Sequence, residues 1–439
     1  MSDDDLLIRA LAGAVGPHHV LAGADLVAGF VADWTGRWVG HTKAVVRPAT
    51  VEQVQAVVAI CAAHAVPIVP QGGNTGLVGG SIPHRGEVVV SLRRLDRLGP
   101  VDVGAREVTV EAGVTIAALQ DHARRAGLAY GVDLASRDSA TVGGTIATNA
   151  GGMNVVAYGD TRSQVLGLQV VFADGRVGNR LTGVVKESTG PDPFRLMVGS
   201  EGTLGIITAA RLRLVRPASE APHVTLVPVE TLAEGVRHVG PGVRAIEFFD
   251  HACLELVIEH RHLARPLDVE APFYVLIESA ELPDLEEGTP AVVDRRLWAY
   301  RENITETLNQ QGVPVKLDVA VPPDQMDTFV VLLRELEVAG EVYLFGHLAE
   351  GNFHVNVLAS TDPARVVDQV LGLVAQMGGA IASEHGIGIA KAAWWRRTAD
   401  PTFVAVSREI KEALDPGRIL NPEVFWGEEP PGRRDGEAG

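Results

Sequence analysis

The sequence predicts an α+β protein built from two domains. Short strand-forming segments alternate with helical patterns along the whole chain, and no internal repeat is present. At 439 residues the chain exceeds one ordinary hydrophobic core. After Arg216-Pro217 glycine becomes less frequent and the helical patterns lengthen. We therefore expect an N-terminal segment over 1–36, a first domain over 37–217, a second domain over 218–400 and a C-terminal helical segment with a tail over 401–439.

Composition excludes several classes of function. Apolar residues make up 46% and charged residues 21%, as in ordinary globular proteins. The net charge of −17 argues against nucleic acid or an anionic membrane surface as the main partner. Cys61 and Cys253 lie among apolar residues without any CxxC motif, which favours reduced thiols. No secretory signal and no membrane span are visible, so we expect a cytoplasmic protein.

In the first domain, strands and helices follow one another closely. Thr50 is the expected N-cap of a helix over VEQVQAVVAICAAHA, and VPIVP then reads as a short buried strand. VVVSL and VTVEAG are expected strands, and a helix should begin near Thr115 and end at Gly127. LGLQVVFADGRV predicts a strand with an Asp-Gly turn, and GTLGIITAARLRLV predicts a further strand from Gly202 through Ile206 onward.

The second domain carries longer helical patterns, in LWAYRENITETLNQQG and DQMDTFVVLLRELEVAG. The strand-like segments FYVLIES, KLDVAVP and EVYLFGH lie around and between them. A last helix is expected over FVAVSREIKEALDP, before GRILNPE and a tail rich in glycine, proline and charge.

Two histidines seven residues apart flank the polar centre of GHLAEGNFHVNV. Gly351-Asn352 interrupts the run and the flanks are strand formers, so we expect a hairpin with its turn over Ala349–Asn352. Leu348 would then face Phe353, and His347 would face His354. Asn356 would share the face of His354, because strand side chains alternate. The alternative is two polar side chains on a solvated hairpin face.

Three separated segments rich in glycine, serine, threonine and asparagine lie in the first domain. PIVPQGGNTGLVGG has five glycines within nine positions but fits neither GxxxxGK[ST] nor GxGxxG. Glycine there allows positive φ and lets backbone N–H groups face an anion. SATVGGTIATNAGGMNVVAYGDTR and MVGSEGTLGIIT are the other two segments. Together they suit a long ligand with a diphosphate and a polar ring edge, such as a dinucleotide. A flexible loop is the alternative for PIVPQGGNTGLVGG.

PQGGNTGLVGG, ATVGGTIATNAGG, GSEGTLGIIT, GNFHVNV, SEHGIG and ILNP, in this order, resemble the FAD-linked oxidases of the vanillyl-alcohol oxidase (PCMH) fold. Within them the D-2-hydroxyacid dehydrogenases, which include D-2-hydroxyglutarate and D-lactate dehydrogenases, match best. The resemblance runs from Asp33 to Pro422. It implies FAD in the first domain and an α+β cap domain for the substrate. The positions implied to bind the cofactor are Pro70, Gln71, Gly72, Gly73, Asn74, Thr75, Gly76, Leu77, Ser139, Gly143, Gly144, Thr148, Gly202, Gly205, Ile206 and Asn421.

The two histidines need a third ligand to hold a metal ion. GGAIASEHGIGIAK offers Glu384 and His385 side by side; a loop ion pair or solvated side chains are the alternative. Two imidazoles and one carboxylate with open positions suit a catalytic Zn²⁺, or Mn²⁺ or Fe²⁺. The resemblance implies that His347, His354 and Glu384 are the ligands and His385 the base. The family usually has GDGN where this chain has AEGN, a departure we assign to the shape of the turn.

Cations are needed to hold the carboxylates of a hydroxyacid. Arg301 and Thr305 are spaced i, i+4 on a predicted helix, and Lys316 follows in the next strand. In an unknown protein these are more often solvated surface residues. They match substrate-contacting positions of the D-2-hydroxyglutarate dehydrogenases, which implies the same role here, and Asn356 is expected to join them.

The resemblance therefore implies an FAD- and metal-dependent dehydrogenase that oxidises a D-2-hydroxyacid, D-2-hydroxyglutarate first. Hydride would pass from the α-carbon to flavin N5, and the hydroxyl proton, acidified by the metal, to His385. D-lactate or glycolate is the alternative substrate. A metal-dependent hydrolase without flavin and a non-catalytic flavin subunit are the alternatives from other classes. An electron-transfer flavoprotein, a quinone or a cytochrome could accept the electrons. No NAD motif is visible, and a homodimer is among the expected assemblies.

Overall fold

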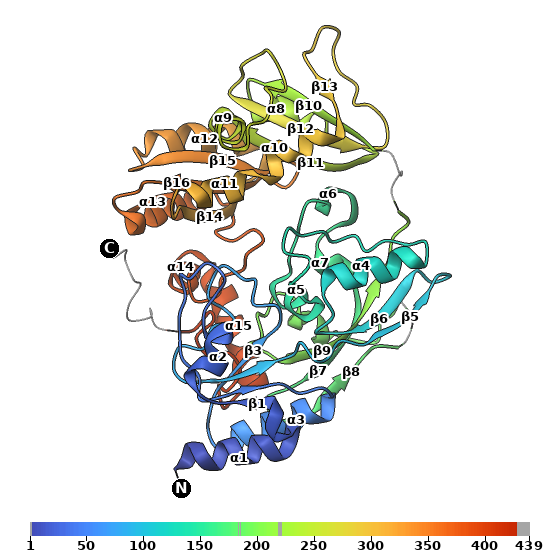
Figure 1. Cartoon of the computed structure of the whole chain (residues 1–439), viewed down its shortest axis with the longest axis vertical. Helices are drawn as coiled ribbons and strands as arrows, with labels where there is room; N and C mark the ends of the chain where they lie inside the picture. The colour runs from blue at the N-terminus through green and yellow to red at the C-terminus, as the bar shows by residue number, and fades with distance from the viewer. Residues whose placement is uncertain (1, 183, 185, 218–221, 428–439) are drawn as a thin grey trace. The chain divides into compact units, whose positions relative to one another are not determined.

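The computed structural model describes residues 2–182, 184, 186–217 and 222–427, and it divides the chain into two compact units (Figure 1). Unit 1 comprises residues 1–152, 160–216 and 384–439, and unit 2 comprises residues 153–159 and 217–383. The expected boundary after residue 217 thus lies one residue earlier. The N-terminal and C-terminal segments belong to unit 1, and the chain returns to unit 1 at Glu384 instead of near residue 400.

Unit 1 begins with a small sheet of order β1-β2-β4-β3, in which β2, β4 and β3 are parallel and β1 is antiparallel. Its helix α3 starts after Thr50, whose Oγ1 accepts from Gln53 N–H at 3.2 Å. Valines and Cys61 on one face of this helix pack on Ile68 and Val88. The elements are α1 (Asp3–Val15), β1 (Val20–Leu21), α2 (Ala24–Val31), β2 (Val45–Val46), α3 (Val51–Ala63), β3 (Ile68–Gln71) and β4 (Val88–Ser91).

A second, fully antiparallel sheet of order β5-β6-β9-β7-β8 completes the main part of unit 1. Ile116 and Leu119 from α4 and Ile146 from α5 share its core with Val110 and Leu212. The elements are β5 (Leu98–Asp102), β6 (Glu107–Glu111), α4 (Ile116–Arg125), α5 (Val142–Thr148), α7 (Thr161–Gln164), β7 (Val165–Val171), β8 (Val177–Asn179) and β9 (Ile206–Arg213).

The C-terminal segment is tied to the first sheet of unit 1. It contains α14 (Ala392–Thr398) and α15 (Pro401–Leu414), and Leu420 forms a parallel bridge with Ile68 at the end of β3. The buried ammonium of Lys411 donates to the carbonyl oxygens of Thr203 and Leu420 and pairs with Asp415 at 2.5 Å. This network explains why the segment is part of unit 1.

Unit 2 is built on a seven-stranded antiparallel sheet of order β13-β10-β12-β11-β15-β16-β14 (Figure 1). Helices α9 and α11 pack on the face that carries Phe249 and Tyr274. Phe329 of α12 packs on the opposite face against Phe353. The strands are β10 (His223–Val229), β11 (Val243–Asp250), β12 (Phe273–Ser279), β13 (Val292–Val293), β14 (Val315–Ala320), β15 (Glu341–His347) and β16 (Asn352–Leu358).

The helices of unit 2 are α6 (Val155–Tyr158), α8 (Leu232–Val236), α9 (His251–Arg261), α10 (Trp298–Glu302), α11 (Ile304–Gln311), α12 (Met326–Glu335) and α13 (Pro363–Gln376). Both units mix sheets and helices, so the predicted α+β class is confirmed.

Candidate functional site

The glycine-rich loop after β3 forms a backbone cradle. A Cβ at Gly72 would lie 2.3 Å from Thr141 Oγ1, and one at Gly73 would lie 2.0 Å from the carbonyl oxygen of Ser139. No side chain fits at these distances, so both positions require glycine. Within the described part of the chain, the backbone N–H groups of residues 72–77 donate to no protein acceptor. A run of such donors is the kind of surface that binds a diphosphate.

Side chains on both flanks hold this loop in place. Asn74, at φ +56°, donates from Nδ2 to the carbonyl oxygen of Ala32 at 2.8 Å and accepts from Ser81 Oγ. Gln71 donates from Nε2 to the carbonyl oxygens of Phe30 and Ser81. Asn74 is therefore occupied in shaping the loop, and the backbone around it stays open to a ligand. The other predicted residues of this loop are Pro70, Thr75, Gly76 and Leu77.

The second predicted segment, residues 139–162, contains α5, α6 and the start of α7, and the start of α5 lies next to the cradle. A Cβ at Gly143 would lie 2.7 Å from Ala112 Cβ, so glycine lets α5 pack closely against Ala112, the residue that follows β6. Thr141 Oγ1 accepts from Gly144 N–H, and Thr148 Oγ1 donates to the Gly144 carbonyl oxygen at 3.1 Å. Of the predicted residues in this segment, Ser139 and Gly144 thus border Gly72 and Gly73, while Gly143 packs on Ala112 and Thr148 bonds within α5.

The third segment differs from its predicted form. A strand from Gly202 to Ile206 was expected, but β9 begins only at Ile206. Glu201 and Gly202 have φ values of +50° and +76°, which turn the chain before the strand. A Cβ at Gly205 would lie 2.5 Å from Val170 Cγ1, so only glycine leaves room for the chain to pack this closely on β7 just before β9 begins. The turn places Gly202 beside Pro70 of the cradle.

Glu201 fixes the loop that follows Glu384 and His385. Its Oε1 and Oε2 accept from Ile387 N–H and Gly388 N–H, each at 2.8 Å. Burial raises the pKa of Glu201 to about 7, while these two hydrogen bonds and the charge of Lys391 act in the opposite direction. The loop that carries the predicted base is thereby attached to the third segment within unit 1.

Asn421 closes this arrangement. Its Nδ2 donates to the carbonyl oxygens of Gly80 and Glu201, at 2.8 and 2.7 Å. The cradle loop, the third segment and the C-terminal ILNP motif therefore meet within unit 1. The backbone N–H groups of residues 72–77, which donate to no acceptor among the described residues, fit the diphosphate of FAD, a dinucleotide with a polar ring edge.

In unit 2, the histidine hairpin is present but its register differs from the predicted one. Phe345 pairs with His354 across β15 and β16, so His347 is not opposite His354 and the predicted pairing of Leu348 with Phe353 is also wrong. The strands end at His347 and begin again at Asn352, so the turn spans 348–351 and not 349–352. The predicted register is off by two residues.

The two histidines still share one face of the sheet. A shift of two residues preserves the alternation of side chains, so His347 and His354 lie diagonally with ring centroids 5.6 Å apart. Gly351 allows the tight turn, because it has φ +65° and a Cβ there would lie 2.0 Å from the Val321 carbonyl oxygen. Asn356 lies on the same face, as predicted from its spacing to His354.

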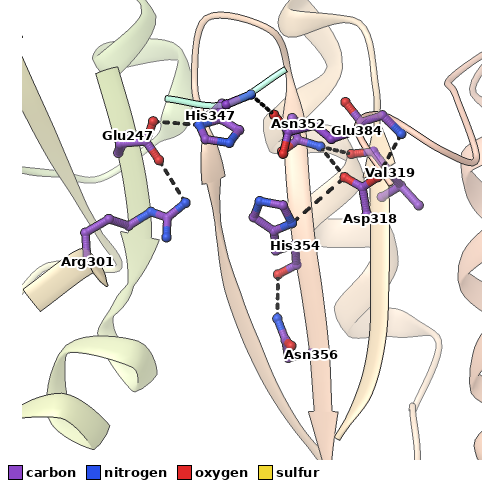
Figure 2. Close-up of polar contacts among 11 residues, drawn as sticks. Glu247, Arg301, Asp318, Val319, His347, Asn352, His354, Asn356 and Glu384 are labelled. Atoms are coloured by element: carbon purple, nitrogen blue, oxygen red, sulfur yellow. Dashed lines mark hydrogen bonds and ion pairs between the residues drawn. The ribbon is translucent and has the colours of Figure 1, made fainter. Parts of the chain in front are cut away.

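Each imidazole has a buried carboxylate beside its Nδ1 atom (Figure 2). Glu247 Oε1 of β11 lies 2.6 Å from His347 Nδ1, and Asp318 Oδ1 of β14 lies 3.9 Å from His354 Nδ1. A carboxylate at Nδ1 favours the tautomer that keeps the Nε2 lone pair, the form in which histidine binds a metal. The two imidazoles therefore fit the ligands of a divalent metal, and His347 would offer Nε2 to it.

Glu384 and His385, the remaining predicted metal and catalytic residues, are the first residues of the chain segment that returns to unit 1. The chain leaves unit 2 at Ser383, whose backbone N–H donates to Asp318 Oδ2 at 3.0 Å. Asp318 pairs with His354 across β14 and β16, so one peptide bond separates Glu384 from a residue fixed beside the histidine strand. Within unit 1, Glu384 Oε1 accepts from Gly152 N–H.

Arg301 lies on the histidine side of the unit 2 sheet. Its guanidinium forms an ion pair with Glu247 Oε2 at 2.8 Å and stacks on Phe345 at 4.6 Å from the ring centroid. Phe345 is the residue directly opposite His354. The side chain of Arg301 is only 11% exposed, and among the described residues its Nε has no hydrogen-bond partner. This buried, partly unsatisfied cation is suited to an anionic ligand.

Lys316 lies on the other side of the histidine pair. It is opposite Asn356 across β14 and β16, two residues before Asp318 on the same face. Asn356 is buried and donates from Nδ2 to the His354 carbonyl oxygen. Thr305 is partly buried in α11. The helix predicted over this segment is divided into α10 and α11 at Asn303, although the φ and ψ of Asn303 are themselves helical. Two cations thus flank the histidines within unit 2.

Three acidic residues of the site were not predicted from the sequence: Glu247, Asp318 and Glu201. Each is an acidic residue inside a segment of apolar or small residues: AIEFFD, KLDVAVP and GSEGTLG. A carboxylate at a position expected to be buried needs a partner, so these three residues could have been marked in the sequence as candidates for a functional site. The partners themselves are remote in sequence and could not be identified from it.

Two family models match the chain. An FAD binding domain matches residues 42–179, and the C-terminal domain of FAD linked oxidases matches residues 227–424. The D-2-hydroxyglutarate dehydrogenase of Xanthomonas citri pv. viticola is 38% identical over 430 residues, covering 89% of this chain and 90% of that protein. The mitochondrial D-2-hydroxyglutarate dehydrogenase of Rattus norvegicus is 33% identical over 425 residues, covering 89% and 79%.

Solved structures agree in fold. p-Cresol methylhydroxylase with substrate bound superposes with a TM-score of 0.74 at 17% identity, covering 97% of both chains. Alkyldihydroxyacetonephosphate synthase gives 0.70 at 17% identity, covering 95% of this chain and 84% of that one. At this identity the likeness concerns the fold alone, and it confirms the vanillyl-alcohol oxidase type of fold expected from the motifs.

Among the described residues, none of the helices has the length and apolar character needed to cross a membrane. Some relatives carry "mitochondrial" in their names, so the cytoplasmic location stays a prediction.

Proposed function

The chain belongs to the FAD-linked oxidases and is an FAD-dependent D-2-hydroxyacid dehydrogenase, and on this premise we propose that its substrate is D-2-hydroxyglutarate. The observation that carries the proposal is the pair of cations on either side of the histidines. Arg301 stacks on the residue opposite His354, and Lys316 lies next to Asn356 on the same face. A dicarboxylate gives each cation one carboxylate to bind.

The names of the relatives support the same substrate, since both relatives described above are D-2-hydroxyglutarate dehydrogenases. A monocarboxylate such as D-lactate or glycolate would bring a carboxylate to only one of the two cations. If that cation were Lys316, the buried Nε of Arg301 would keep no acceptor among the described residues, and an unsatisfied buried donor costs about 1–3 kcal/mol.

We assign the metal ligands to His347, His354 and Glu384, with Zn²⁺ first and Mn²⁺ or Fe²⁺ as alternatives. Glu247 supports this assignment because it orients His347 through Nδ1, and Asp318 places a negative charge 3.9 Å from Nδ1 of His354. When bound, the metal supplies a Lewis acid that lowers the pKa of the substrate hydroxyl. Asn356 would contact the substrate on the same face of the sheet.

FAD, when bound, supplies the two-electron acceptor. The backbone of residues 72–77 would bind its diphosphate, and the segments around Gly143 and Gly202 would border its other parts. His385 would take the hydroxyl proton on an imidazole nitrogen. Glu201 would hold the loop after His385 through Ile387 and Gly388. The electron acceptor named from the sequence, a flavoprotein, quinone or cytochrome, stays a prediction, as does a homodimer.

The substrate assignment is tested by steady-state dye reduction with D-2-hydroxyglutarate, L-2-hydroxyglutarate, D-lactate and glycolate. The variants are Arg301→Met and Lys316→Met, with the exposed Arg296→Met and Lys186→Met as matched controls. Loss of one charge-assisted hydrogen bond, about 1.5–3 kcal/mol, should lower kcat/KM for D-2-hydroxyglutarate by about 10- to 150-fold.

At least one of the two variants should leave kcat/KM for D-lactate near its wild-type value, because the carboxylate that this cation binds is absent from D-lactate. Preferred turnover of D-lactate by the wild type, or equal losses on both substrates in both variants, would contradict the dicarboxylate assignment. The controls should match the wild type on every substrate.

A further inference from the structure

Glu247 has contacts that set it apart from the other acidic residues of the sheet. It lies within β11, its side chain is 1% exposed, and it faces two functional side chains from different elements. His347 of β15 is its cross-strand neighbour, with Nδ1 2.6 Å from Oε1. The guanidinium of Arg301 from α10 lies 2.8 Å from Oε2. One carboxylate thus bridges a predicted metal ligand and a predicted substrate ligand (Figure 2).

Toward His347, the carboxylate selects one tautomer. A proton on Nδ1 is stabilised by Oε1, so the lone pair remains on Nε2, and the ring cannot rotate without losing this contact. The negative charge also increases the basicity of the imidazole as a ligand. Both effects raise metal affinity.

Toward Arg301, the carboxylate fixes orientation. The guanidinium is held between Glu247 and the Phe345 ring, so its plane is set by an ion pair and by stacking. Nε stays buried without a partner among the described residues, which leaves it directed to a ligand. Without Glu247, the long side chain of Arg301 would have to lose its rotamer freedom when the anion binds.

We propose that Glu247 is a positioning residue shared by the metal site and the anion site: it orients His347 for the metal and Arg301 for one of the two carboxylates of the substrate. This inference rests on the proposed function. It predicts that substituting Glu247, which would not itself contact the substrate, weakens the binding of a cation and of an anion together.

The informative substitution is Glu247→Asp, because it keeps the charge and retracts the carboxylate by one methylene. The shorter side chain cannot contact both partners, so position is lost while the net charge of the site is unchanged. Glu247→Gln serves as the second variant: it keeps the length and removes the charge. The control is Glu278→Gln, a buried carboxylate of β12 that is paired with Arg244 and Trp298 but contacts neither His347 nor Arg301.

Binding is measured on the flavin-containing full-length protein with two probes. Zn²⁺ alone reports on His347, and glutarate, a dicarboxylate without the reacting hydroxyl, reports on Arg301. In Glu247→Asp the dissociation constant of Zn²⁺ should rise by about 10- to 100-fold, the usual effect of losing a carboxylate that orients a ligand. That of glutarate should rise by about tenfold. Glu247→Gln should weaken Zn²⁺ at least as much, and Glu278→Gln should change neither constant.

Non-additivity separates positioning from a general structural effect. In an Arg301→Met background, adding Glu247→Asp should no longer change glutarate binding but should still weaken Zn²⁺ binding. The proposal is overturned if Glu247→Asp binds both probes as the wild type does, or if its effect on glutarate is the same with and without Arg301. A wild type that binds neither probe would instead contradict the proposed function. Unfolding of Glu247→Asp would be detected as loss of flavin, and the Zn²⁺ dissociation constant of Glu247→Gln would then test the proposal in its place.

Discussion

Replacing Glu201 by glutamine should change how the stability of unit 1 depends on pH. Glu201 is buried, and desolvation raises its pKa from 4.5 to about 7. In the unfolded chain the ordinary value applies. The folded protein therefore binds this proton more tightly than the unfolded chain does, and the resulting stabilisation is fully present below pH 4.5 and is lost as the pH rises to about 7.

The magnitude follows from the shift. One pKa unit corresponds to about 1.4 kcal/mol, so a shift from 4.5 to about 7 contributes roughly 3 kcal/mol. Glutamine is neutral at every pH and titrates in neither state. The free energy of unfolding of the wild type minus that of Glu201→Gln should therefore fall by roughly 3 kcal/mol between pH 4.5 and about pH 8. Other titrating groups cancel in this difference, because both proteins contain them.

Urea unfolding of the FAD-bound protein measures this difference, with release of flavin fluorescence as the signal for unit 1. A difference that is constant over this pH range would refute the argument. A difference that rises with pH would show that the hydrogen bonds from Ile387 and Gly388 and the charge of Lys391 outweigh burial, so that the carboxylate and not the acid is the favoured buried form.

Three further predictions follow from the packing and from the metal assignment. Gly73→Ala should lower the flavin content of the purified protein, measured as visible absorbance per protein, because the alanine Cβ would collide with the Ser139 carbonyl oxygen. The control Gly13→Ala in α1, where a Cβ meets nothing within 4 Å, should keep the wild-type flavin content. Lys411→Met should destabilise the fold by about 3–5 kcal/mol in urea unfolding, since it leaves the buried Asp415 without its cation, and an unchanged unfolding curve would contradict this. Chelation should abolish dye reduction without loss of flavin colour, and added Zn²⁺ should restore it; full activity with no bound metal would contradict the metal assignment.

The glycine-rich segments could be predicted from the sequence because their requirement is local. A missing Cβ at Gly72 or Gly73 and a positive φ at Gly202 are properties of the residue type itself. The hairpin histidines were predicted to share a face, and they do, since an error of two residues in register leaves strand alternation intact. An error of one residue would have separated them.

The register itself could not be predicted, because it depends on contacts outside the hairpin. Asn352 belongs to β16 and not to the turn: its Nδ2 donates to Asp318 and to the Val319 carbonyl oxygen in the neighbouring strand β14. Likewise, Glu247 meets His347 across 100 residues, and Glu201 meets Ile387 across 186. Only the assembled fold brings such carboxylates to their partners.

Anaerobic mixing of the purified protein with D-2-hydroxyglutarate tests the proposed oxidation in a single turnover, because the bound flavin is then the only electron acceptor present. We expect D-2-hydroxyglutarate to bleach the visible flavin absorbance of the metal-loaded protein, and L-2-hydroxyglutarate to leave it unchanged. Flavin that stays oxidised with D-2-hydroxyglutarate while D-lactate or glycolate reduces it would contradict the substrate assignment. Flavin that is reduced by none of these acids would contradict the dehydrogenase account as a whole.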